Sequence, residues 1–386
     1  MIKRLLLPCL LCGMGLLIVA APDVASQSKP AAVDPDPLFP VVVNGKWGYI
    51  DRAGKIVLKP QFDNAGKFSE GFAAVNIGAK PFWYGVPVGG KYGFIDKMGN
   101  YIVRPRFDEA SHFSEGLAAV AMGGEFKGRT YKPQKWGFIN SKGELVIKLT
   151  LNYAGDFSEG LASVSVGGKP GKLGVRNGGK VGCIDKSGKF VIAPQVTSFS
   201  GFTEGLAPFR IGSWEQGKEG YMDKTGKVVI EPKFDSASPF HDGLAVVDVN
   251  KKAGYIDKTG AFIVEPQYAN ASHFSEGLAS VQVGKKWGYI DTAGRTVIEP
   301  QFEVAFEFSE GLAVVCNGSK PDSTGALKGG KCGFIDKTGR IIIPLEFDAA
   351  DGFRDGLALV FVGDLEEGAR NGYIDKTGKY AWEPTK

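Results

Sequence analysis

Apolar and polar residues follow a short recurring pattern along most of the chain. In Val41-Val42-Val43-Asn44-Gly45-Lys46-Trp47, two apolar or β-prone runs flank Asn-Gly. Asn-Gly is the strongest short hairpin signal, because both central residues of a type I′ turn need a positive φ. A second turn follows at places such as Asp257-Lys258-Thr259-Gly260, where Asp starts a type I turn and Gly takes the left-handed position. Each recurrence therefore predicts a three-stranded antiparallel meander.

The three strands of a meander are typified by Leu312 to Val315, Trp287 to Asp291 and Thr296 to Glu299, which we call strands one, two and three. Proline is expected to end strand three, because it lacks the N–H that a ladder needs. The prolines at this place are Pro60, Pro105, Pro194, Pro232, Pro266, Pro300 and Pro384. A linking segment follows, with room for one helical turn, and its Phe62 and Phe68 are expected to fill the gap between neighbouring meanders.

Self-similarity extends the pattern over nine units. KWGYIDRAG at Lys46 returns in eight later copies, and the Trp position falls at residues 47, 92, 136, 181, 219, 253, 287, 332 and 371. A glycine follows that position in every copy, from Gly48 to Gly372. On these motifs the chain resembles the WG-repeat (KWG-type) family of bacterial repeat proteins. Five copies depart from the motif by replacing the aromatic residue, namely Val181, Glu219, Ala253, Cys332 and Asn371. The resemblance implies a repeat scaffold and implies little about activity.

The predicted fold is all-β, a tandem array of nine meanders over residues 41–386. The shortest unit spans 34 residues, whereas a propeller blade usually takes about 40 to 45 residues and four strands. Propeller closure often shares one blade between the two ends, but this chain begins with strand one and ends after strand three. We therefore favour an open solenoid or twisted β-array, with a closed β-propeller as the alternative.

The N-terminal region reads as an export signal. Lys3 and Arg4 precede an apolar run from Leu5 to Ala21, and small residues follow. We expect residues 1–26 to be a signal peptide cut after Ser26, with cleavage nearby as the alternative, and residues 27–40 to be a Pro/Asp-rich linker. A lipid anchor at Cys12 is disfavoured by the bulky Leu11 before it, and an uncleaved anchor by the shortness of the run. The mature protein is then secreted or periplasmic, with no membrane span.

Net charge argues against one class of partner. The formal charge is +4, and loss of Lys3 and Arg4 leaves +2 (4 minus 2). That value is too small to indicate nucleic acid.

Candidate chemistry is sparse. Asp-Lys-Thr-Gly recurs at Asp223, Asp257, Asp336 and Asp375 and matches the phosphorylation motif of cation-pumping ATPases, but the Thr that should come next is absent, so turn chemistry is favoured. An acid recurs after the linker Phe of eight units, and we expect it to bond linker amides or to pair with the Lys before the Trp position. These acids are Glu70, Glu115, Glu159, Glu204, Asp242, Glu276, Glu310 and Asp355.

Metal and cofactor sites are not expected. His112 and His273 take the same place in different units, far from a common point, and zinc needs converging ligands. The chain has no metalloprotease, nucleophile-elbow or phosphate-loop motif. We therefore predict a protein that is not an enzyme and has no cofactor or metal. The alternative is a hydrolase acting on envelope polymers.

Insertions mark the candidate binding region. Residues 77–90, 121–134, 165–179, 210–217, 317–330 and 361–369 all enlarge the connection between strands one and two, and insertions at one phase of a repeat project from one edge. Aromatic and cationic residues there suit a protein or glycan partner. The alternative is that the aromatic rings cover the ends of the meanders. The candidate residues are Phe82, Trp83, Tyr84, Phe126, Arg129, Tyr131, Lys169, Lys172, Arg176 and Trp214.

Two of the three cysteines of the mature chain fall at facing positions. Alignment of units seven and eight puts Cys316 at the place of Gln282 and Cys332 at that of Trp287, and a two-residue turn at Gly284-Lys285 makes those places face each other. Directly opposed Cβ atoms lie about 4.5–5.5 Å apart, close to the disulfide range. We expect this pair to form a disulfide, with two buried thiols as the alternative, and Cys183 to be unpaired.

Overall fold

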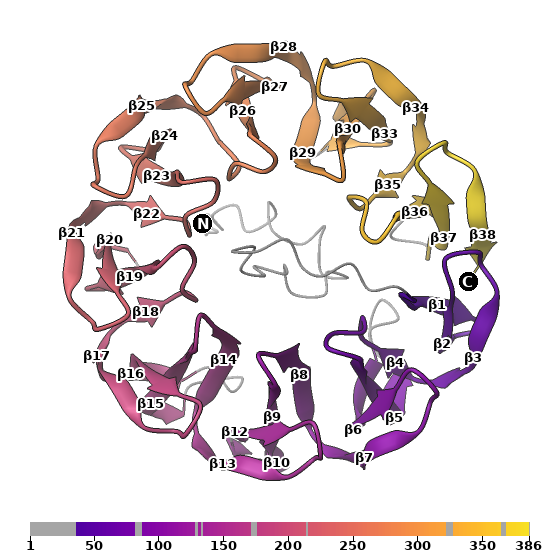
Figure 1. Cartoon of the computed structure of the whole chain (residues 1–386), viewed down its shortest axis with the longest axis vertical. Coiled ribbons are helices and arrows are strands. Elements are labelled where there is room, and N and C mark those ends of the chain that lie inside the picture. Colours follow the sequence, from indigo (N-terminus) through magenta and orange to yellow (C-terminus); the bar gives the residue numbers. More distant parts are fainter. Residues whose placement is uncertain are drawn as a thin grey trace, which may run out of the picture.

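The computed structural model describes residues 36–81, 87–127, 130–132, 134–170, 176–213, 215–321, 327–363 and 368–385. Within these ranges there is no helix, and nine antiparallel sheets stand side by side as the blades of a closed ring (Figure 1). The all-β class and the nine antiparallel units are confirmed. The preference for an open array is wrong: the chain is a nine-bladed β-propeller.

Most blades contain a strand that the sequence analysis missed. The linking segment pairs with strand one as an inner strand near the ring axis, where a helical turn was allowed for, so the blade is a four-stranded meander (Figure 1). Blade 7 reduces this strand to one bridge between Ala271 and Val281, and the described residues of blade 1 supply none. The inner strands are β4 (Asn64–Ala65), β8 (Glu109–Ser114), β14 (Tyr153–Ser158), β18 (Ser198–Phe199), β22 (Ser236–Ala237), β29 (Val304–Ser309) and β35 (Ala349–Ala350).

Strands one and two form the hairpin at the centre of each blade. Strands one are β1 (Phe39–Val43), β5 (Phe72–Pro81), β9 (Leu117–Met122), β15 (Leu161–Pro170), β19 (Leu206–Ile211), β23 (Ala245–Val249), β26 (Leu278–Val283), β30 (Leu312–Asn317) and β36 (Leu357–Val362). Strands two are β2 (Lys46–Ile50), β6 (Pro87–Asp96), β12 (Lys135–Asn140), β16 (Arg176–Asp185), β20 (Lys218–Asp223), β24 (Lys252–Ile256), β27 (Lys286–Asp291), β33 (Lys331–Asp336) and β37 (Arg370–Asp375). The first strand begins at Phe39, inside the segment expected to be linker.

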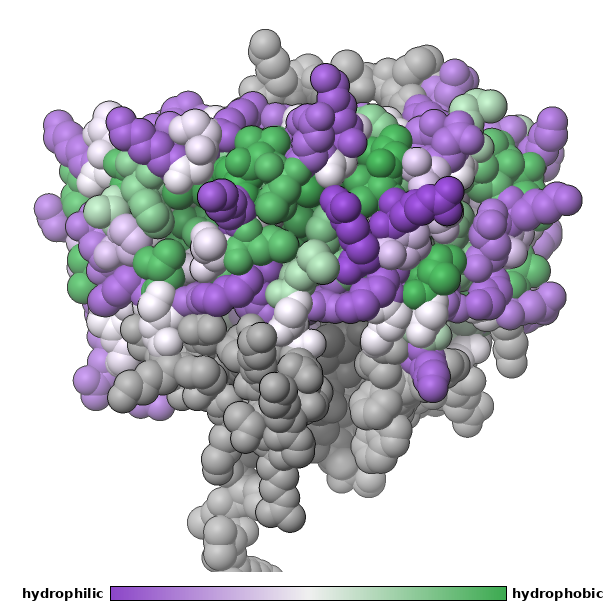
Figure 2. Space-filling view, turned by 90° about the horizontal axis from the view of Figure 1, so that it is seen from below, coloured by the Kyte–Doolittle hydropathy of each residue, from purple (hydrophilic) through white to green (hydrophobic). Residues whose placement is uncertain are grey.

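Strand three forms the outside of the ring. The outer strands are β3 (Ile56–Phe62), β7 (Tyr101–Phe107), β13 (Leu145–Leu151), β17 (Phe190–Val196), β21 (Val228–Phe234), β25 (Phe262–Tyr268), β28 (Thr296–Phe302), β34 (Ile341–Phe347) and β38 (Tyr380–Thr385). Exposed apolar side chains such as Val57, Val146 and Val191 lie near the start of these strands, and the side of the ring seen in Figure 2 carries apolar patches among charged residues.

Proline does not end strand three, contrary to expectation. Tyr49 pairs with Leu58 and Trp47 pairs with Phe62, so a bulge lies between them and contains Pro60. A bulged residue makes no ladder bond, so the missing N–H has no cost there. The bulge explains the glycine after the Trp position, because a Cβ on Gly48 would lie 2.5 Å from the carbonyl oxygen of Leu58.

Each interface between blades is a small apolar core. Between blades 1 and 2, Tyr49 and Phe62 pack with Ala73 and Val75, and Phe68 closes the cluster. The Tyr49 hydroxyl donates to the carbonyl oxygen of Gly66, 2.7 Å away. Phe62 and Phe68 therefore fill the gap between neighbouring units, as predicted.

Blade 9 meets blade 1 to close the ring, and among the described strands no blade combines segments from both ends of the chain (Figure 1). Phe39 and Val41 pack against Leu357 and Tyr373 in one buried cluster. The ring therefore closes without a blade built from both ends of the chain, because a buried apolar cluster joins blade 9 to blade 1. No helix among the described residues is both long and apolar enough to cross a membrane.

Candidate functional site: the insertion face

The meander topology gives the ring two chemically different faces. Antiparallel connections alternate between the two ends of the strands. The connection from strand one to strand two therefore shares a face with the link to the next blade, and we call this the insertion face. The turn from the inner strand to strand one shares the opposite face, the turn face, with the Asp-X-X-Gly turn. All six insertions thus leave the ring on one face.

The recurring acids lie on the turn face and hold neighbouring blades together. Each has a positive φ of 51° to 56°. The Glu310 carboxylate accepts a hydrogen bond from the Gly356 N–H at 3.1 Å and lies 3.1 Å from the Lys376 ammonium. The same acid-to-glycine bond joins Glu70 to Gly116, Glu115 to Gly160, Glu159 to Gly205, Glu204 to Gly243, Asp242 to Gly277, and Glu276 to Gly311.

The lysine partner of these acids differs from the predicted one. Bonds to linker amides are confirmed, but the paired lysine comes from the Asp-Lys-X-Gly turn of the next blade, because that turn ends on the same face. The pairs are Lys186–Glu115, Lys224–Glu159, Lys258–Glu204, Lys337–Glu276 and Lys376–Glu310. At ring closure Arg52 donates to the carbonyl oxygen of Asp355, 2.9 Å away.

The aspartates of the Asp-Lys-Thr-Gly turns have a local role. Oδ1 of Asp223 accepts hydrogen bonds from the Thr225 N–H at 2.9 Å and the Thr225 hydroxyl at 2.6 Å. The hydroxyl bond lowers the pKa of this carboxyl group. Turn chemistry thus accounts for the motif.

The histidines lie at interfaces between blades. His241 and His273 stack with ring centroids 4.3 Å apart, and His112 lies 3.7 Å from Asp156. Burial, together with the nearby His273, lowers the pKa of His241 to about 4. Among the described residues, no group of three metal-ligating side chains occurs.

On the insertion face, the lysine before the Trp position meets an acid that follows strand three. Lys331 lies 2.7 Å from Asp348, whose other oxygen accepts from the Gly363 N–H of the next blade at 2.8 Å. The same arrangement joins Lys46 to Asp63, Lys91 to Asp108, Lys218 to Asp235, and Lys286 to Glu303. The hydrogen bond from Lys218 lowers the pKa of Asp235.

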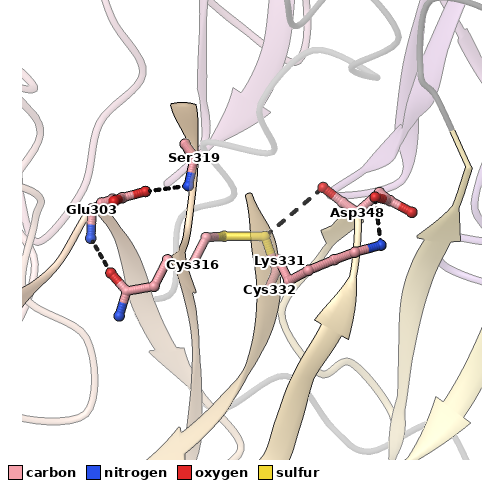
Figure 3. The surroundings of a disulfide bond; sticks show 7 residues. Glu303, Cys316, Ser319, Lys331, Cys332 and Asp348 are labelled. Atoms are coloured by element: carbon pink, nitrogen blue, oxygen red, sulfur yellow. Dashed lines mark hydrogen bonds and ion pairs between the residues drawn. A yellow bond between two sulfur atoms is a disulfide. The ribbon is translucent and has the colours of Figure 1, made fainter. Parts of the chain in front are cut away.

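The predicted disulfide is confirmed at the base of one insertion. Cys316 and Cys332 are directly opposed in β30 and β33 and are joined by a disulfide (Figure 3). Glu303 accepts from the Ser319 N–H at 2.8 Å and so holds the start of the same insertion. Cys183 is unpaired and buried, and burial raises its pKa to about 12.

The other candidate residues lie on or beyond the described parts of the insertions. Phe82, Trp83, Tyr84, Arg129, Lys172 and Trp214 lie outside the described residues. The backbone places Phe126 opposite Tyr131 in the hairpin β10 (Glu125–Lys127) and β11 (Thr130–Lys132), and it places Lys169 and Arg176 near the ends of β15 and β16. A second described hairpin, β31 (Lys320–Pro321) and β32 (Leu327–Lys328), belongs to the insertion of blade 8. The binding role of the candidates stays a prediction.

Sequence reasoning missed a buried ion pair in blade 5. The Arg210 Nε lies 2.9 Å from Glu219 Oε1, and both side chains are largely buried. The Arg210 guanidinium also donates to the Gly217 and Asp235 carbonyl oxygens at 2.9 and 2.7 Å. The sequence signal that could have identified this ion pair is Glu219 at the Trp position together with Arg210 at the position opposite it.

Comparison with known proteins identifies the repeat. The family model described as WG containing repeat matches more than half of the chain, at residues 47–80, 92–126, 136–169, 182–213, 220–252, 254–287, 287–320 and 333–365. No curated protein matches.

Two solved structures give only a coarse likeness. Tricorn protease is 12% identical, with a TM-score of 0.27 over 90% of this chain and 39% of that one. Acylaminoacyl peptidase from Pyrococcus horikoshii is 11% identical, with a TM-score of 0.38 over 70% of this chain and 51% of that one. The chain thus spans about half or less of each, and at these scores the likeness carries no argument about function. By its repeats, the chain belongs to the family of proteins with WG-containing repeats.

Proposed function

We propose that the protein is an exported, non-catalytic binding scaffold that engages a protein or a cell-envelope glycan through its insertions. The observation that carries the proposal is the structural difference between the two faces of the ring. Turn-face acids, lysines and amides are engaged with one another between blades, whereas the insertion face carries all six enlarged connections. Insertions at one phase of a repeat array commonly form its binding surface.

The test compares the full chain with a variant that lacks one insertion. Blade 7 connects strands one and two with Gly284-Lys285, and its Val283 pairs with Lys286 as Val166 pairs with Lys180 in blade 4. Replacing residues 167–179 with Gly-Lys therefore removes an insertion and keeps the register.

Pull-down from envelope extract should recover a stoichiometric partner with the full chain, and removal of insertions should lose it while the melting temperature stays near that of the parent. Equal recovery without any of the six insertions would overturn the insertion-face assignment. Turnover of an envelope polymer that one carboxylate substitution abolishes would instead establish the hydrolase alternative.

The aromatic candidates allow a finer test. Replacing Trp83, Tyr84 and Tyr131 with Ala should weaken partner binding with little change in melting temperature. A large loss of stability with unchanged affinity would show that these rings cover the blades.

A further inference from the structure

We propose that the outside of the ring is a self-association surface, on which blades 1–3 of one copy of this chain dock against blades 6–9 of a second copy. This surface lies apart from the insertions, so the inference goes beyond the proposed function. The observations are the segregation of charge among the outer strands, the apolar side chains beside those charges, and the open edges of the strands.

The outer strands divide by the sign of their charge. The fourth residue is exposed in all nine of them, and the sixth residue is exposed in eight. Every charged residue of β3, β7 and β13 is basic, and we call this set the basic arc: Lys59, Arg104, Arg106 and Lys148. Every charged residue of β25, β28, β34 and β38 is acidic, and we call this set the acidic arc: Glu265, Glu299, Glu346 and Glu383. Between the arcs, β17 has no charged residue and β21 has one of each sign.

Neighbouring side chains do not neutralise either arc. Within the described parts of the chain, none of these eight side chains is in an ion pair. Arg295 and Arg340 lie in the turns before β28 and β34, but they are paired with Asp291 and Asp336 at 2.7 and 3.2 Å and so leave the acidic arc uncompensated. Opposite charges across a contact favour it, and like charges oppose it. Each arc therefore accepts the other and repels itself.

Apolar side chains and open strand edges supply the area of contact. Val57 and Val146 in the strands of the basic arc, and Ile263 and Val297 in those of the acidic arc, are 43–45% exposed. Each outer strand ends its sheet, so one of its edges has no strand partner among the described residues. An open edge beside apolar side chains is suited to contact with another chain. Because the neutral strands share these features, charge decides which strands meet.

A second copy is the partner that this distribution favours, because both complementary surfaces belong to one molecule. A partner of one sign would engage one arc and be repelled by the other. The arcs are different patches, so the contact is heterologous, with the basic arc of one copy on the acidic arc of the next. The ring is convex in outline (Figure 1), and each contact therefore involves few blades. We expect a weak, salt-sensitive association, with a Kd on the order of micromolar or weaker.

Sedimentation equilibrium of the purified protein, over a range of protein and salt concentrations, measures the association. The average mass should rise with protein concentration at low salt and return to that of a single chain at high salt. The basic-arc variant is Lys59→Glu, Arg104→Glu and Lys148→Glu, and the acidic-arc variant is Glu265→Lys, Glu299→Lys and Glu346→Lys. Each should weaken self-association by about tenfold or more, because opposed charges become like charges. The control, Lys189→Glu, Lys227→Glu and Lys233→Glu, makes the same charge change on blades 4 and 5 and should have little effect.

A mixture of the two arc variants provides the sharpest test. Each variant repels its own copies, but the acidic surfaces of one match the basic surfaces of the other, so the mixture should associate. Recovery in the mixture also shows that both variants are folded. A parent protein that stays a single chain up to its solubility limit would overturn the proposal. Equal losses in the control, or no recovery when both variants keep the melting temperature of the parent, would overturn the assignment to the arcs.

Discussion

Apolar side chains fill the space between adjacent blades in two different ways. The interface between blades 1 and 2 shows one, and the seam between blades 9 and 1 shows the other. In the first, the inner strand of blade 2 covers strand one, and Phe68 packs edge-on to Tyr49 at 4.8 Å between ring centroids. At the seam the described residues supply no inner strand. Phe39 instead packs against Tyr373 at 5.4 Å.

Repeat-by-repeat comparison shows how the seam is filled. Phe39 stands opposite Ile50, at a place that is Ala in all eight other blades, for example Ala73 opposite Ile95. Trp382 stands opposite Tyr373, where the other eight blades have Leu, Ile or Val. Two large residues therefore occupy volume that an inner strand and its Phe supply elsewhere.

The hydrogen bonds of the inner strand are also replaced. In blade 2 the Asn76 and Ala74 carbonyl oxygens accept from the amides of Asp63 and Gly66. In blade 1 the matching carbonyl oxygens of Val42 and Pro40 accept from the hydroxyls of Thr385 and Tyr373, at 2.7 and 3.0 Å. Side chains of one blade can thus replace a missing strand of the next, so a ring can close without a shared blade.

The largest expected effect on stability comes from removing a large buried side chain at the seam. Phe39→Ala should lower the free energy of unfolding by about 3–5 kcal/mol, because it removes a buried ring at an interface where the described residues supply no inner strand. Guanidinium unfolding followed by tryptophan fluorescence measures this. Ile56→Ala, at an exposed outer position, serves as the control, and an equally small loss in both variants would contradict the role given to Phe39.

The reciprocal change should also destabilise the protein, by a smaller amount. Ala73→Phe places the seam residue in an interface where β4 and Phe68 already fill the space, and overpacking costs about 1–3 kcal/mol. The same unfolding measurement applies. A stabilised variant would show that blades 1 and 2 leave room at their interface, and the comparison with the seam would lose its basis.

The interface between blades 6 and 7 should respond to pH in a way that the others do not. Burial lowers the pKa of His241 from 6.5 to about 4, so below pH 6.5 the unfolded chain binds a proton that the folded protein resists. The stabilisation is complete above pH 6.5 and is lost as the pH falls through about 4. Discounted for partial exposure, it amounts to roughly 1–2 kcal/mol.

His241→Ser gives a matched test, because Ser occupies this position in other units and Ser275 donates to the next blade's Phe308 carbonyl oxygen at 2.7 Å. The variant should flatten the pH dependence of the unfolding midpoint between pH 6.5 and 4 relative to the parent. An unchanged slope would assign that dependence to other groups.

Local chemistry was predictable from the sequence, whereas closure was not. The turn at Asn44-Gly45 has the expected φ values of 51° and 73°, and the opposed cysteines followed from register alone. The inner strands escaped notice because several, such as β4, contain only two residues, too few for an alternating pattern. Phe39 lies in the segment that was expected to be linker, and its role depends on a partner from the other end of the chain, Tyr373.

The smallest predicted effect concerns a single hydroxyl at the seam. Thr385→Val keeps the side-chain shape and removes the donor to the Val42 carbonyl oxygen, as well as the acceptor for the Trp382 indole N–H at 3.1 Å. Loss of these bonds at a part-buried site should reduce the free energy of unfolding by about 1 kcal/mol. Gln301 follows Pro300 in blade 7 as Thr385 follows Pro384, and it is exposed, so Gln301→Val should change stability by less than about 0.5 kcal/mol. Equal effects of the two substitutions would mean that the Val42 carbonyl needs no replacement partner, because water satisfies it at the open edge of β1. A loss confined to Thr385→Val would show that the seam depends on side-chain hydrogen bonds as well as on its two large rings.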